Sequence, residues 1–447
     1  MSQSLRQNNL FLGQDWRVLY QAMSQVNFNS YDYDTIRQAL IDYIRLNYPE
    51  DFNDWIESSE FVAIIELLSY LASSLAFRLD LNIRENFIDT ATRRDSIFRL
   101  ARLISYNPRR CIAAQGLVKL TQVITDQNIF DSNGFNLANV PVIWNDANNP
   151  DWFEQFVLVL NASFSKVNPF GQPVKTGSVN GLTVERYDLD NIVTRTLAFP
   201  FTSVVNGQQM NFEFVNTDFV GSVNGSITVG AAGYYREKTP NYILPWSLLY
   251  RNDGNGNASP DTGFFGLFKQ GTLAFTDFVL SEPLSNRVLD LTALNVNESD
   301  VWVETVDDQG NTLIEWTKVP ALFGTNIAYN ALNRATRDIF QVITRDISGT
   351  DSISIKFSDG NFGNIPVGRI RVYYRTSNNL TYTILPQEIA SVPLSLSYYR
   401  ENDGTSQNLL QMQFDLQSTV ANSLSRESNT FIKERAPAVF YSQNRLS

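Results

Sequence analysis

The side chains that most often carry out enzyme chemistry are scarce in this sequence of 447 residues. It contains no histidine, which excludes serine-histidine and cysteine-histidine nucleophile systems and histidine-ligated zinc. Its single cysteine, Cys111, cannot form an intrachain disulfide or a cysteine cage for a metal, and this usage is typical of a reducing compartment. Phosphate-cradling, dinucleotide-binding and nucleophile-elbow motifs are absent. We therefore expect no catalytic, cofactor-binding or metal-binding residues and interpret the chain as a non-enzyme.

Two groups of neighbouring carboxylates are the strongest candidates for acid-base chemistry. They are Asp307 with Asp308, and Glu298 with Asp300. Two carboxyl groups about 5 to 9 Å apart are sufficient for glycoside hydrolysis without histidine. Both groups lie in turn-like stretches, where carboxylates commonly serve turn formation and solubility. We interpret them as turn residues, and a tail-associated glycoside hydrolase stays open as a less favoured alternative.

The stretch over residues 252–257 begins like a calcium-binding loop, because oxygen-bearing side chains alternate along it. Ala258 stands at the position of the glycine that makes the sharp turn, and Phe264 stands at that of the glutamate that closes the site. We interpret this stretch as an ordinary turn.

Arginines are concentrated between residues 84 and 110. They are Arg84, Arg93, Arg94, Arg99, Arg102, Arg109 and Arg110. Asp89 and Asp95 each precede one of them by four residues, which is the spacing of ion pairs along a helix. The whole chain has a net charge of -11, which repels a phosphate backbone. We therefore interpret the arginines as a solvated or protein-facing surface and expect no nucleic-acid partner.

The patterning of apolar residues predicts helices first and strands afterwards. Helical spacing covers residues 15–26, 34–47, 58–79 and 89–105, and it returns over 408–426. After Gly116, short alternating runs separated by turn residues predict strands, and the turn at Asp359 and Gly360 predicts a hairpin between residues 353–357 and 370–374. We expect an α+β fold with an N-terminal α-helical head, a large, mostly antiparallel β body and a C-terminal helical segment.

We predict five segments along the chain. They are an N-terminal arm with a short helix (1–33), a helical head that forms an inter-subunit bundle (34–110), a β-rich body (111–345), a β-hairpin domain (346–405) and a C-terminal helical segment (406–447).

The helix predicted over residues 58–79 has a wider apolar stripe than packing on a small sheet requires. Burial contributes about 1.5–3 kcal/mol for each large side chain, so we expect helices of this chain or of another subunit to cover the stripe. The candidate interface residues are Phe61, Ile64, Leu68, Leu71, Leu75, Arg93 and Arg94. Because Glu66 interrupts the apolar run and Arg78 follows it, we expect no membrane span.

Several motifs are specific as an ordered set. The head contains Asn-Tyr-Pro-Glu-Asp-Phe-Asn-Asp-Trp-Ile-Glu-Ser-Ser at residues 47–59, Leu-Ala-Ser-Ser-Leu-Ala-Phe-Arg at 71–78 and Arg-Glu-Asn-Phe-Ile-Asp-Thr-Ala at 84–91. Towards the other end are Phe-Ser-Asp-Gly-Asn-Phe-Gly at 357–363 and Lys-Glu-Arg-Ala-Pro at 433–437. Residues 15–110 and 350–446 resemble the T-even-type baseplate wedge proteins, the family of the gene six product, within the baseplate J-like proteins.

The resemblance implies a structural subunit in the baseplate wedge of a contractile phage tail. Such a subunit is a homo-oligomer in the virion, is assembled in the host cytoplasm, and forms the inner ring around the tail hub. The implied partners are a second copy of the chain, other baseplate wedge proteins, the sheath initiator and tail hub proteins. A receptor-binding or glycan-binding tail protein is the other alternative, since β-rich bodies with many asparagines and aromatic residues suit glycans.

Overall fold

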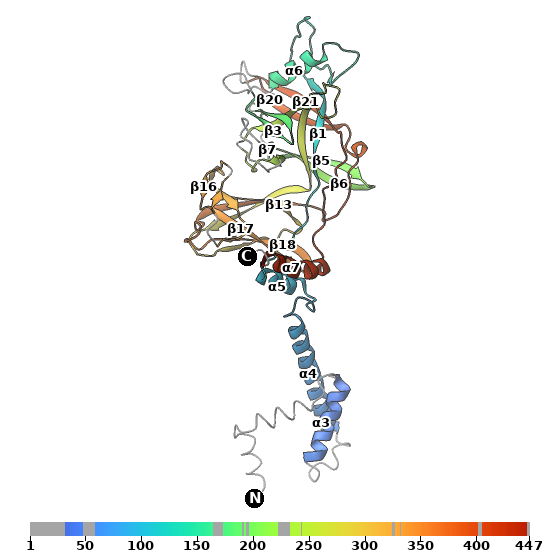
Figure 1. The fold of residues 1–447 in the computed structure, drawn as a ribbon, viewed down its shortest axis with the longest axis vertical. Helices are drawn as coiled ribbons and strands as arrows, with labels where there is room; N and C mark the ends of the chain where they lie inside the picture. Colours follow the sequence, from blue (N-terminus) through green and yellow to red (C-terminus); the bar gives the residue numbers. More distant parts are fainter. Residues whose placement is uncertain are drawn as a thin grey trace. The chain divides into compact units, whose positions relative to one another are not determined.

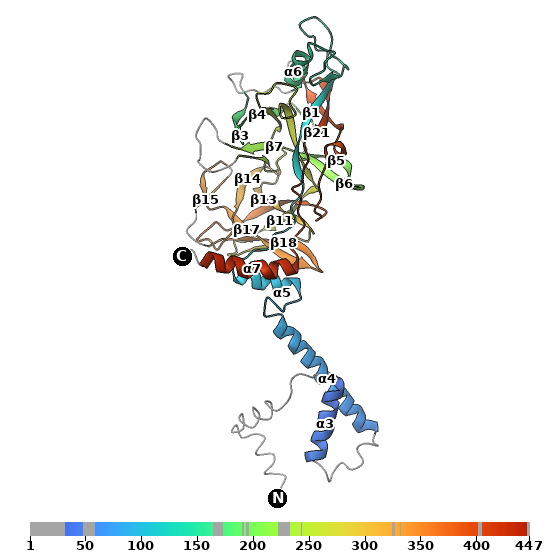
Figure 2. The same cartoon turned by 45° about the vertical axis from the view of Figure 1, so that its right-hand side comes forward.

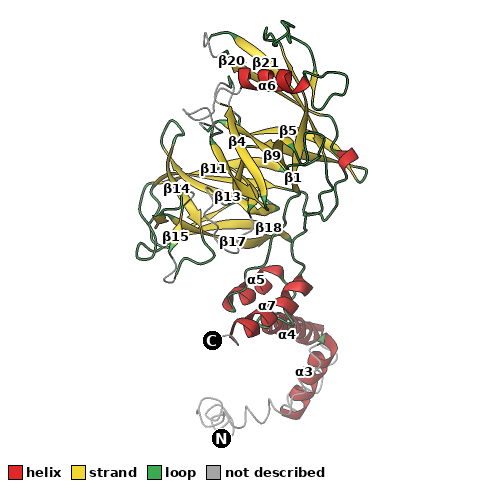
Figure 3. Cartoon of the chain, turned by 45° about the horizontal axis from the view of Figure 1, so that its top comes forward, coloured by secondary structure: helices red, strands yellow, loops and turns green. Residues whose placement is uncertain are grey.

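The computed structural model describes residues 32–47, 59–163, 173–189, 192–193, 196–221, 233–242, 244–323, 327–330, 332–400 and 405–444 (Figure 1). The chain divides into two compact units, Met1–Leu103 and Ile104–Ser447. The first unit contains helices among its described residues, and the second is dominated by strands (Figure 3). The predicted α+β fold with an N-terminal helical head, a mostly antiparallel β body and a C-terminal helix is confirmed.

The first unit contains three described helices: α3 (Tyr33–Asn47), α4 (Ser59–Arg84) and α5 (Arg94–Leu103). At the start of α3, the backbone N–H of Thr35 donates to Asp32 Oδ1 at 3.2 Å, which satisfies one of the free donors of a helix end. Helix α3 lies alongside α4 (Figure 2), and Ile41 and Ile65 are buried between them. The helix predicted over residues 15–26 falls outside the described residues.

Helix α5 begins later than predicted, because the chain turns between Arg84 and Arg94. The carboxylate of Glu85 accepts hydrogen bonds from the backbone N–H groups of Thr92 and Arg93, at 2.9 Å and 3.2 Å to Oε1. The hydroxyl of Thr92 donates to the same oxygen at 2.6 Å. Burial alone would raise the pKa of Glu85, but these hydrogen bonds lower it to about 2. Glu85 therefore orders the N-terminus of α5 from outside the helix.

The larger sheet of the second unit has ten strands and is antiparallel throughout, with the main order β20-β21-β1-β10-β9-β4-β3. Its strands are β1 (Gln115–Thr125), β2 (Val142–Ile143), β3 (Lys175–Val179), β4 (Leu182–Leu189), β5 (Ala198–Val205), β6 (Gln208–Val215), β9 (Trp246–Asn252), β10 (Gly263–Gln270), β20 (Val392–Tyr399) and β21 (Gln407–Leu416). Helix α6 (Trp152–Ser163) packs beside β1 and β2.

The second sheet has seven strands in the order β11-β19-β13-β14-β17-β18-β12. They are β11 (Thr272–Leu280), β12 (Val288–Asp290), β13 (Val296–Val306), β14 (Thr312–Lys318), β17 (Ile339–Ile347), β18 (Thr350–Phe357) and β19 (Gly368–Thr376). Only β14 and β17 pair in parallel among these strands. Two small sheets pair β7 (Thr217–Val220) with β8 (Tyr234–Glu237), and β15 (Ala328–Tyr329) with β16 (Ala335–Thr336). A 3-10 turn, η1 (Pro386–Glu388), and helix α7 (Asn429–Asn444) complete the described elements.

The chain passes from the first sheet to the second at Gly271, between β10 and β11. The φ angle of Gly271 is +112°, and a Cβ atom there would lie 2.1 Å from the backbone oxygen of Thr376. Glycine is required at this crossing because both the conformation and the close approach exclude a side chain.

The predicted hairpin between residues 353–357 and 370–374 is wrong, although both stretches are strands. Strand β18 pairs with β17 and β12, whereas β19 pairs with β11 and β13. The tight turn lies one element earlier, where Ser348 and Gly349 have φ angles of +52° and +84° and join β17 to β18. Alternation of apolar residues identifies a strand, but it does not identify the strand's partner.

The helix predicted over residues 408–426 is also wrong, because residues Gln407–Leu416 form strand β21. Leu410, Met412, Phe414 and Leu416 alternate along it and are buried in the core of the first sheet. The apolar residues of this stretch fit the spacing of a helix as well as that of a strand. The stretch forms a strand because it pairs with β1 and β20. The C-terminal helix, α7, begins only at Asn429.

Candidate functional site

The apolar residues of α4 are exposed along most of the helix. Ile64, Leu68, Leu71 and Leu75, which we name the apolar face of α4, are 47–57% exposed. Their neighbours Leu67, Tyr70, Phe77 and Leu79 are 60–69% exposed. Soluble monomers rarely leave a contiguous apolar surface of this kind uncovered.

The covered side of α4 is narrow. Ile65 is 4% exposed and packs on Ile41, and Leu40 contacts the same cluster. Ser69, one turn further along, is fully buried and its hydroxyl donates to the backbone oxygen of Ile65 at 2.7 Å. Helix α3 therefore covers one side of α4, and the apolar face of α4 stays exposed among the described residues.

The predicted interface residues do not all lie on this surface. Phe61 belongs to α4, but its side chain falls outside the described part of the structure. Arg93 is exposed and directly precedes α5. Arg94 is 8% exposed, and its guanidinium carbon lies 4.6 Å from the centre of the Phe98 ring. Arg94 therefore packs within the structure instead of facing a partner.

Residues Val62–Arg84 are long and apolar enough to cross a membrane, by length and composition only. In the most apolar stretch of this helix, 11% of the residues are buried. One such helix is weak evidence for a membrane span, so the expectation that this segment does not span a membrane stays a prediction.

The arginine-rich stretch is divided between surface and interior. Arg99 pairs with Asp95 at 3.4 Å, as the four-residue spacing predicts. Arg110 is instead 1% exposed, and its guanidinium donates to the backbone oxygens of Val296, Asn297 and Glu298 at 3.0–3.3 Å. This group serves the fold, because it satisfies backbone acceptors that are buried from water.

Asp253 organises the loop over residues 252–257 through hydrogen bonds within the chain. Its carboxylate accepts hydrogen bonds from Ser259, Thr262 and Asn255, at 2.6–3.0 Å. These bonds lower the pKa of Asp253, with Ser259 making the largest contribution. Asp307 organises its own turn in the same way through Asn311, at 2.7 Å to the backbone nitrogen.

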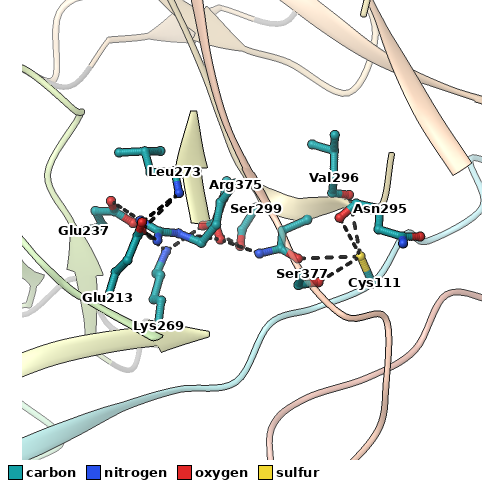
Figure 4. Close-up of polar contacts among 12 residues, drawn as sticks. Cys111, Glu213, Glu237, Lys269, Leu273, Asn295, Val296, Ser299, Arg375 and Ser377 are labelled. Atoms are coloured by element: carbon teal, nitrogen blue, oxygen red, sulfur yellow. Dashed lines mark hydrogen bonds and ion pairs between the residues drawn. The ribbon is translucent and has the colours of Figure 1, made fainter. Parts of the chain in front are cut away.

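The β body contains a buried ionic cluster of Glu213, Glu237, Lys269, Asp300 and Arg375. Glu213, Glu237, Lys269 and Arg375 are labelled in Figure 4. Lys269 Nζ lies 3.1 Å from Glu237 Oε2 and 2.5 Å from Asp300 Oδ1. Arg375 contacts Glu213 through Nη1 and Glu237 through Nη2, the latter at 2.8 Å. Its Nε lies 3.7 Å from Asp300 Oδ2. Each of these side chains is at most 8% exposed.

The cluster connects three sheets. Glu213 and Lys269 come from β6 and β10 of the first sheet, and Asp300 and Arg375 come from β13 and β19 of the second. Glu237 comes from β8 of a small sheet. Because charges leave water only when they are paired and hydrogen-bonded, the cluster fixes how these strands meet.

Three carboxylates face two cations in the cluster, and the pKa values of Asp300 and Glu213 shift in opposite directions. Burial alone would raise the pKa of Asp300, but Lys269 and Arg375 hold it below its usual value. Burial raises the pKa of Glu213 despite its contact with Arg375. The backbone N–H of Leu273 also donates to Glu213, at 3.0 Å to Oε1. The cluster is thus a structural network and not a pair of free acids.

The acid pairs considered for glycoside hydrolysis have separate roles. Asp300 belongs to the buried ionic cluster, and Asn297 Nδ2 also donates to it at 3.1 Å. Glu298 lies 3.6 Å from Arg110 and 4.0 Å from Lys318. Both carboxylates are engaged by cations of the fold. The sequence offered one signal for the cluster, namely charged residues such as Lys269 inside otherwise apolar strands, which typically require buried partners.

Comparison with known protein families gives two matches. Residues 32–103 match the family described as bacteriophage baseplate protein, N-terminal domain, and this range contains α3, α4 and α5. The chain is accordingly a structural protein of a bacteriophage baseplate. No curated protein matches the chain. Residues 116–419 match the domain of unknown function DUF8360. Since that match covers more than half of the 447 residues, the chain belongs to the DUF8360 family.

Proposed function

We propose that this protein is a wedge subunit of the baseplate of a contractile phage tail, and that the apolar face of α4 is its assembly surface. One observation carries the proposal: the exposed face lies within the 32–103 range that matches the baseplate N-terminal domain. Covering it contributes up to about 1.5–3 kcal/mol for each large side chain, which favours association strongly.

The proposed covering elements are helices of a second copy and of other wedge proteins. Helices suit this role because a stripe with helical spacing is complementary to ridges on another helix. The net charge of -11 keeps free subunits soluble before they assemble. The β body contributes further contacts in a ring around the tail hub, beside the sheath initiator. The segment 34–110 is the proposed bundle. The segments 111–345 and 346–405 together form the proposed body, because strands from both belong to each large sheet.

The proposal is tested by placing a charge on the apolar face of α4. Leu68→Asp puts a carboxylate at a position that is 47% exposed in the free chain, so the chain folds but docking buries an unpaired charge. The matched control is Leu313→Asp on β14, where the side chain is 64% exposed. We expect Leu68→Asp to abolish oligomers in light scattering and incorporation into tails, and Leu313→Asp to preserve both.

Normal incorporation of Leu68→Asp would refute the assembly surface. An image reconstruction of the tail provides the second measurement, in which each copy should bury more than about 1,000 Å² with its neighbours. A single copy, or copies at the tail periphery with small contacts, would instead favour a receptor-binding protein. Insertion of Val62–Arg84 into lipid vesicles would also overturn the proposal.

A further inference from the structure

Strand β11 forms one edge of the seven-stranded sheet. All nine of its residues, Thr272–Leu280, pair with β19 without a shift of register, and no other described strand pairs with β11. An edge strand presents backbone N–H and C=O groups on its outer side, where a further strand can pair with them. The hydrogen bonds of alternate residues show which part of this outer side is covered.

Strand β6 covers the beginning of the outer side. In an antiparallel pair, alternate residues direct both backbone groups away from the partner strand. The N–H of Gly271 donates to Asn211 O at 2.9 Å, and the N–H of Leu273 donates to Glu213 Oε1 at 3.0 Å (Figure 4). Both acceptors belong to β6, so the odd-numbered residues of β11 face away from β19.

The remainder of the outer side is open. The same alternation directs the backbone N–H and C=O groups of Phe275, Asp277 and Val279 outward, and none of these groups bonds to the described part of the chain. The side chain of Phe275 is 42% exposed and that of Val279 is 80% exposed. Because β11 ends at Leu280, the uncovered stretch is residues 274–280, which we name the open edge of β11.

The other edge strands of the described structure carry features that prevent pairing with another chain. Strand β12 has three residues and β3 has five. Pro393 lies in β20 and Pro200 in β5, and proline has no N–H to donate. Strand β11 contains no proline, glycine or lysine and no bulge. The open edge of β11 therefore lacks the usual protection against an added strand.

We propose that the open edge of β11 pairs antiparallel with the same edge of a second copy, about a two-fold axis at Asp277. Residues 274–280 are centred on Asp277, so Phe275 lies opposite the partner's Val279, and Val279 lies opposite the partner's Phe275. An aromatic residue opposite a β-branched residue is a favourable cross-strand pair. The partner strand ends before it reaches the part of β11 that β6 covers. The open edge is thus complementary to itself in sequence and in length.

The carboxylate at the centre of the open edge is neutralised within its own chain. Arg371 Nε donates to Asp277 Oδ1 at 2.8 Å, and Arg369 Nε donates to Oδ2 at 3.0 Å. The hydrogen bonds from Arg371 make the largest contribution to lowering the pKa of Asp277. Like charges that face each other across two strands repel, but each Asp277 keeps two guanidinium partners of its own. An added strand with a basic residue at this position would instead meet two further cations.

The contact is small, since seven residues of each copy take part. We therefore expect it to form where copies are already concentrated, as in an assembly, and not to hold two free chains together in dilute solution. It does not depend on which elements cover the apolar face of α4.

The test traps the contact with cysteines at positions 275 and 279. Facing residues of this kind have Cα atoms about 5.5 Å apart, within reach of a disulfide, whereas the two positions of one strand are about 13 Å apart. Phe275→Cys and Val279→Cys are combined in the full chain with Leu68→Asp, so that docking through α4 does not contribute. On oxidation of a concentrated sample, we expect at least tenfold more disulfide-linked dimer than with either cysteine alone. Cys111 is 2% exposed and is common to all variants.

A second measurement uses hydrogen exchange of residues 274–280 in assembled tails. We expect their outward amides to exchange at least tenfold more slowly in tails than in the free chain. Val279→Pro should abolish this protection while leaving the ladder with β19 intact, because the N–H that it removes faces outward. The matched control, Val279→Thr, keeps that N–H and should be protected as the parent is. Thermal melts establish that each variant is folded.

Four results would overturn the proposal. A double variant without extra dimer would exclude the pairing, and single cysteines that link as efficiently would show another register. Protection in tails without the disulfide would assign the open edge to a different tail protein. Protection that survives Val279→Pro would show that the outward N–H groups are not used.

Discussion

The helical head and the β body invert the usual distribution of polar and apolar side chains in different ways. Helix α4 exposes leucines, with Leu71 at 54% and Leu75 at 57%, whereas the β body buries Arg375 completely. In the head, α3 covers the side of α4 that contains Ile65, and we propose that the partner for the exposed face is external. In the body, the partners are internal and come from three sheets. Uncovered apolar surface drives association, while a paired buried charge specifies how segments of one chain meet.

Mutations in the two regions should affect different properties, namely the stability of the free chain and its assembly. Side chains on the apolar face of α4 contribute little to the stability of the free chain, because they lose little water on folding. Members of the buried ionic cluster contribute through their pairing, and removing one partner leaves a charge without compensation. We therefore expect stability and assembly to respond to different regions.

The largest expected effect is from Arg375→Met. This change leaves Glu213, Glu237 and Asp300 facing only Lys269, so the free energy of unfolding of the β body should fall by about 3–5 kcal/mol. The measurement is urea denaturation. The control, Arg345→Met, breaks an exposed pair with Asp290 and should cost less than about 1 kcal/mol. Equal effects of the two changes would show that burial of the cluster is unimportant.

A smaller effect is expected where the two sides of α4 are compared directly. Ile65→Ala removes a buried contact with Ile41 and should destabilise the pairing of α3 and α4 by about 2 kcal/mol or more. Leu68→Ala removes a side chain that is 47% exposed and should cost less than about 1 kcal/mol in the free chain. Hydrogen exchange of the α3 and α4 amides measures both. Faster exchange in Leu68→Ala than in Ile65→Ala would reverse the assignment of the two sides.

A pH-dependent effect is expected from Glu304 on β13, which is 2% exposed and lies opposite Glu315 on β14. Burial raises the pKa of Glu304 to about 7, although Thr312 donates a hydrogen bond to it. A raised pKa means that the folded state binds the proton more tightly, so the stabilisation is complete below pH 4.5 and is lost as the pH rises through about 7.

Glu304→Gln should therefore remove part of this pH dependence. Relative to the parent, the variant should gain about 3 kcal/mol between pH 4 and pH 8, because the amide does not ionise. Thermal melts across this pH range measure the difference. A parent chain and a variant with parallel profiles would contradict the raised pKa. Glu304 therefore shows how much stability the protein loses when a buried carboxylate outside the buried ionic cluster ionises.

The smallest expected effect is at the surface turn of Asp359 and Gly360. Only the glycine has a positive φ, at +92°, and a Cβ atom there would lie 3.1 Å from Ile365 Cδ1. Gly360→Val should cost about 1–2 kcal/mol through this strain, whereas Gly360→Asn, which tolerates positive φ better, should cost less. Urea denaturation ranks the two variants. Because β18 and β19 are not partners, hydrogen exchange in their ladders should be unchanged.

Periodicity alone determined several features of this protein. Apolar residues at helical spacing located α3 and α4, and the count of leucines on α4 exceeded what one neighbouring helix covers. The absence of histidine is likewise a property of composition, and it limits the chemistry available to the chain. These inferences hold because they depend on local geometry or on residue type.

Only the tertiary structure decided which segments pair and which charges are buried. Apolar residues alternate along β18 as predicted, but this strand pairs with β17 and β12. Residues 407–416 form a strand because they pair with β1 and β20. We interpreted Arg94 and Arg110 as surface residues from the sequence, but both are buried. Glu213 and Arg375 form an ion pair although they are 162 positions apart in the chain. Pairing partners and charge neighbours are long-range properties, so residue type and spacing along the chain do not specify them.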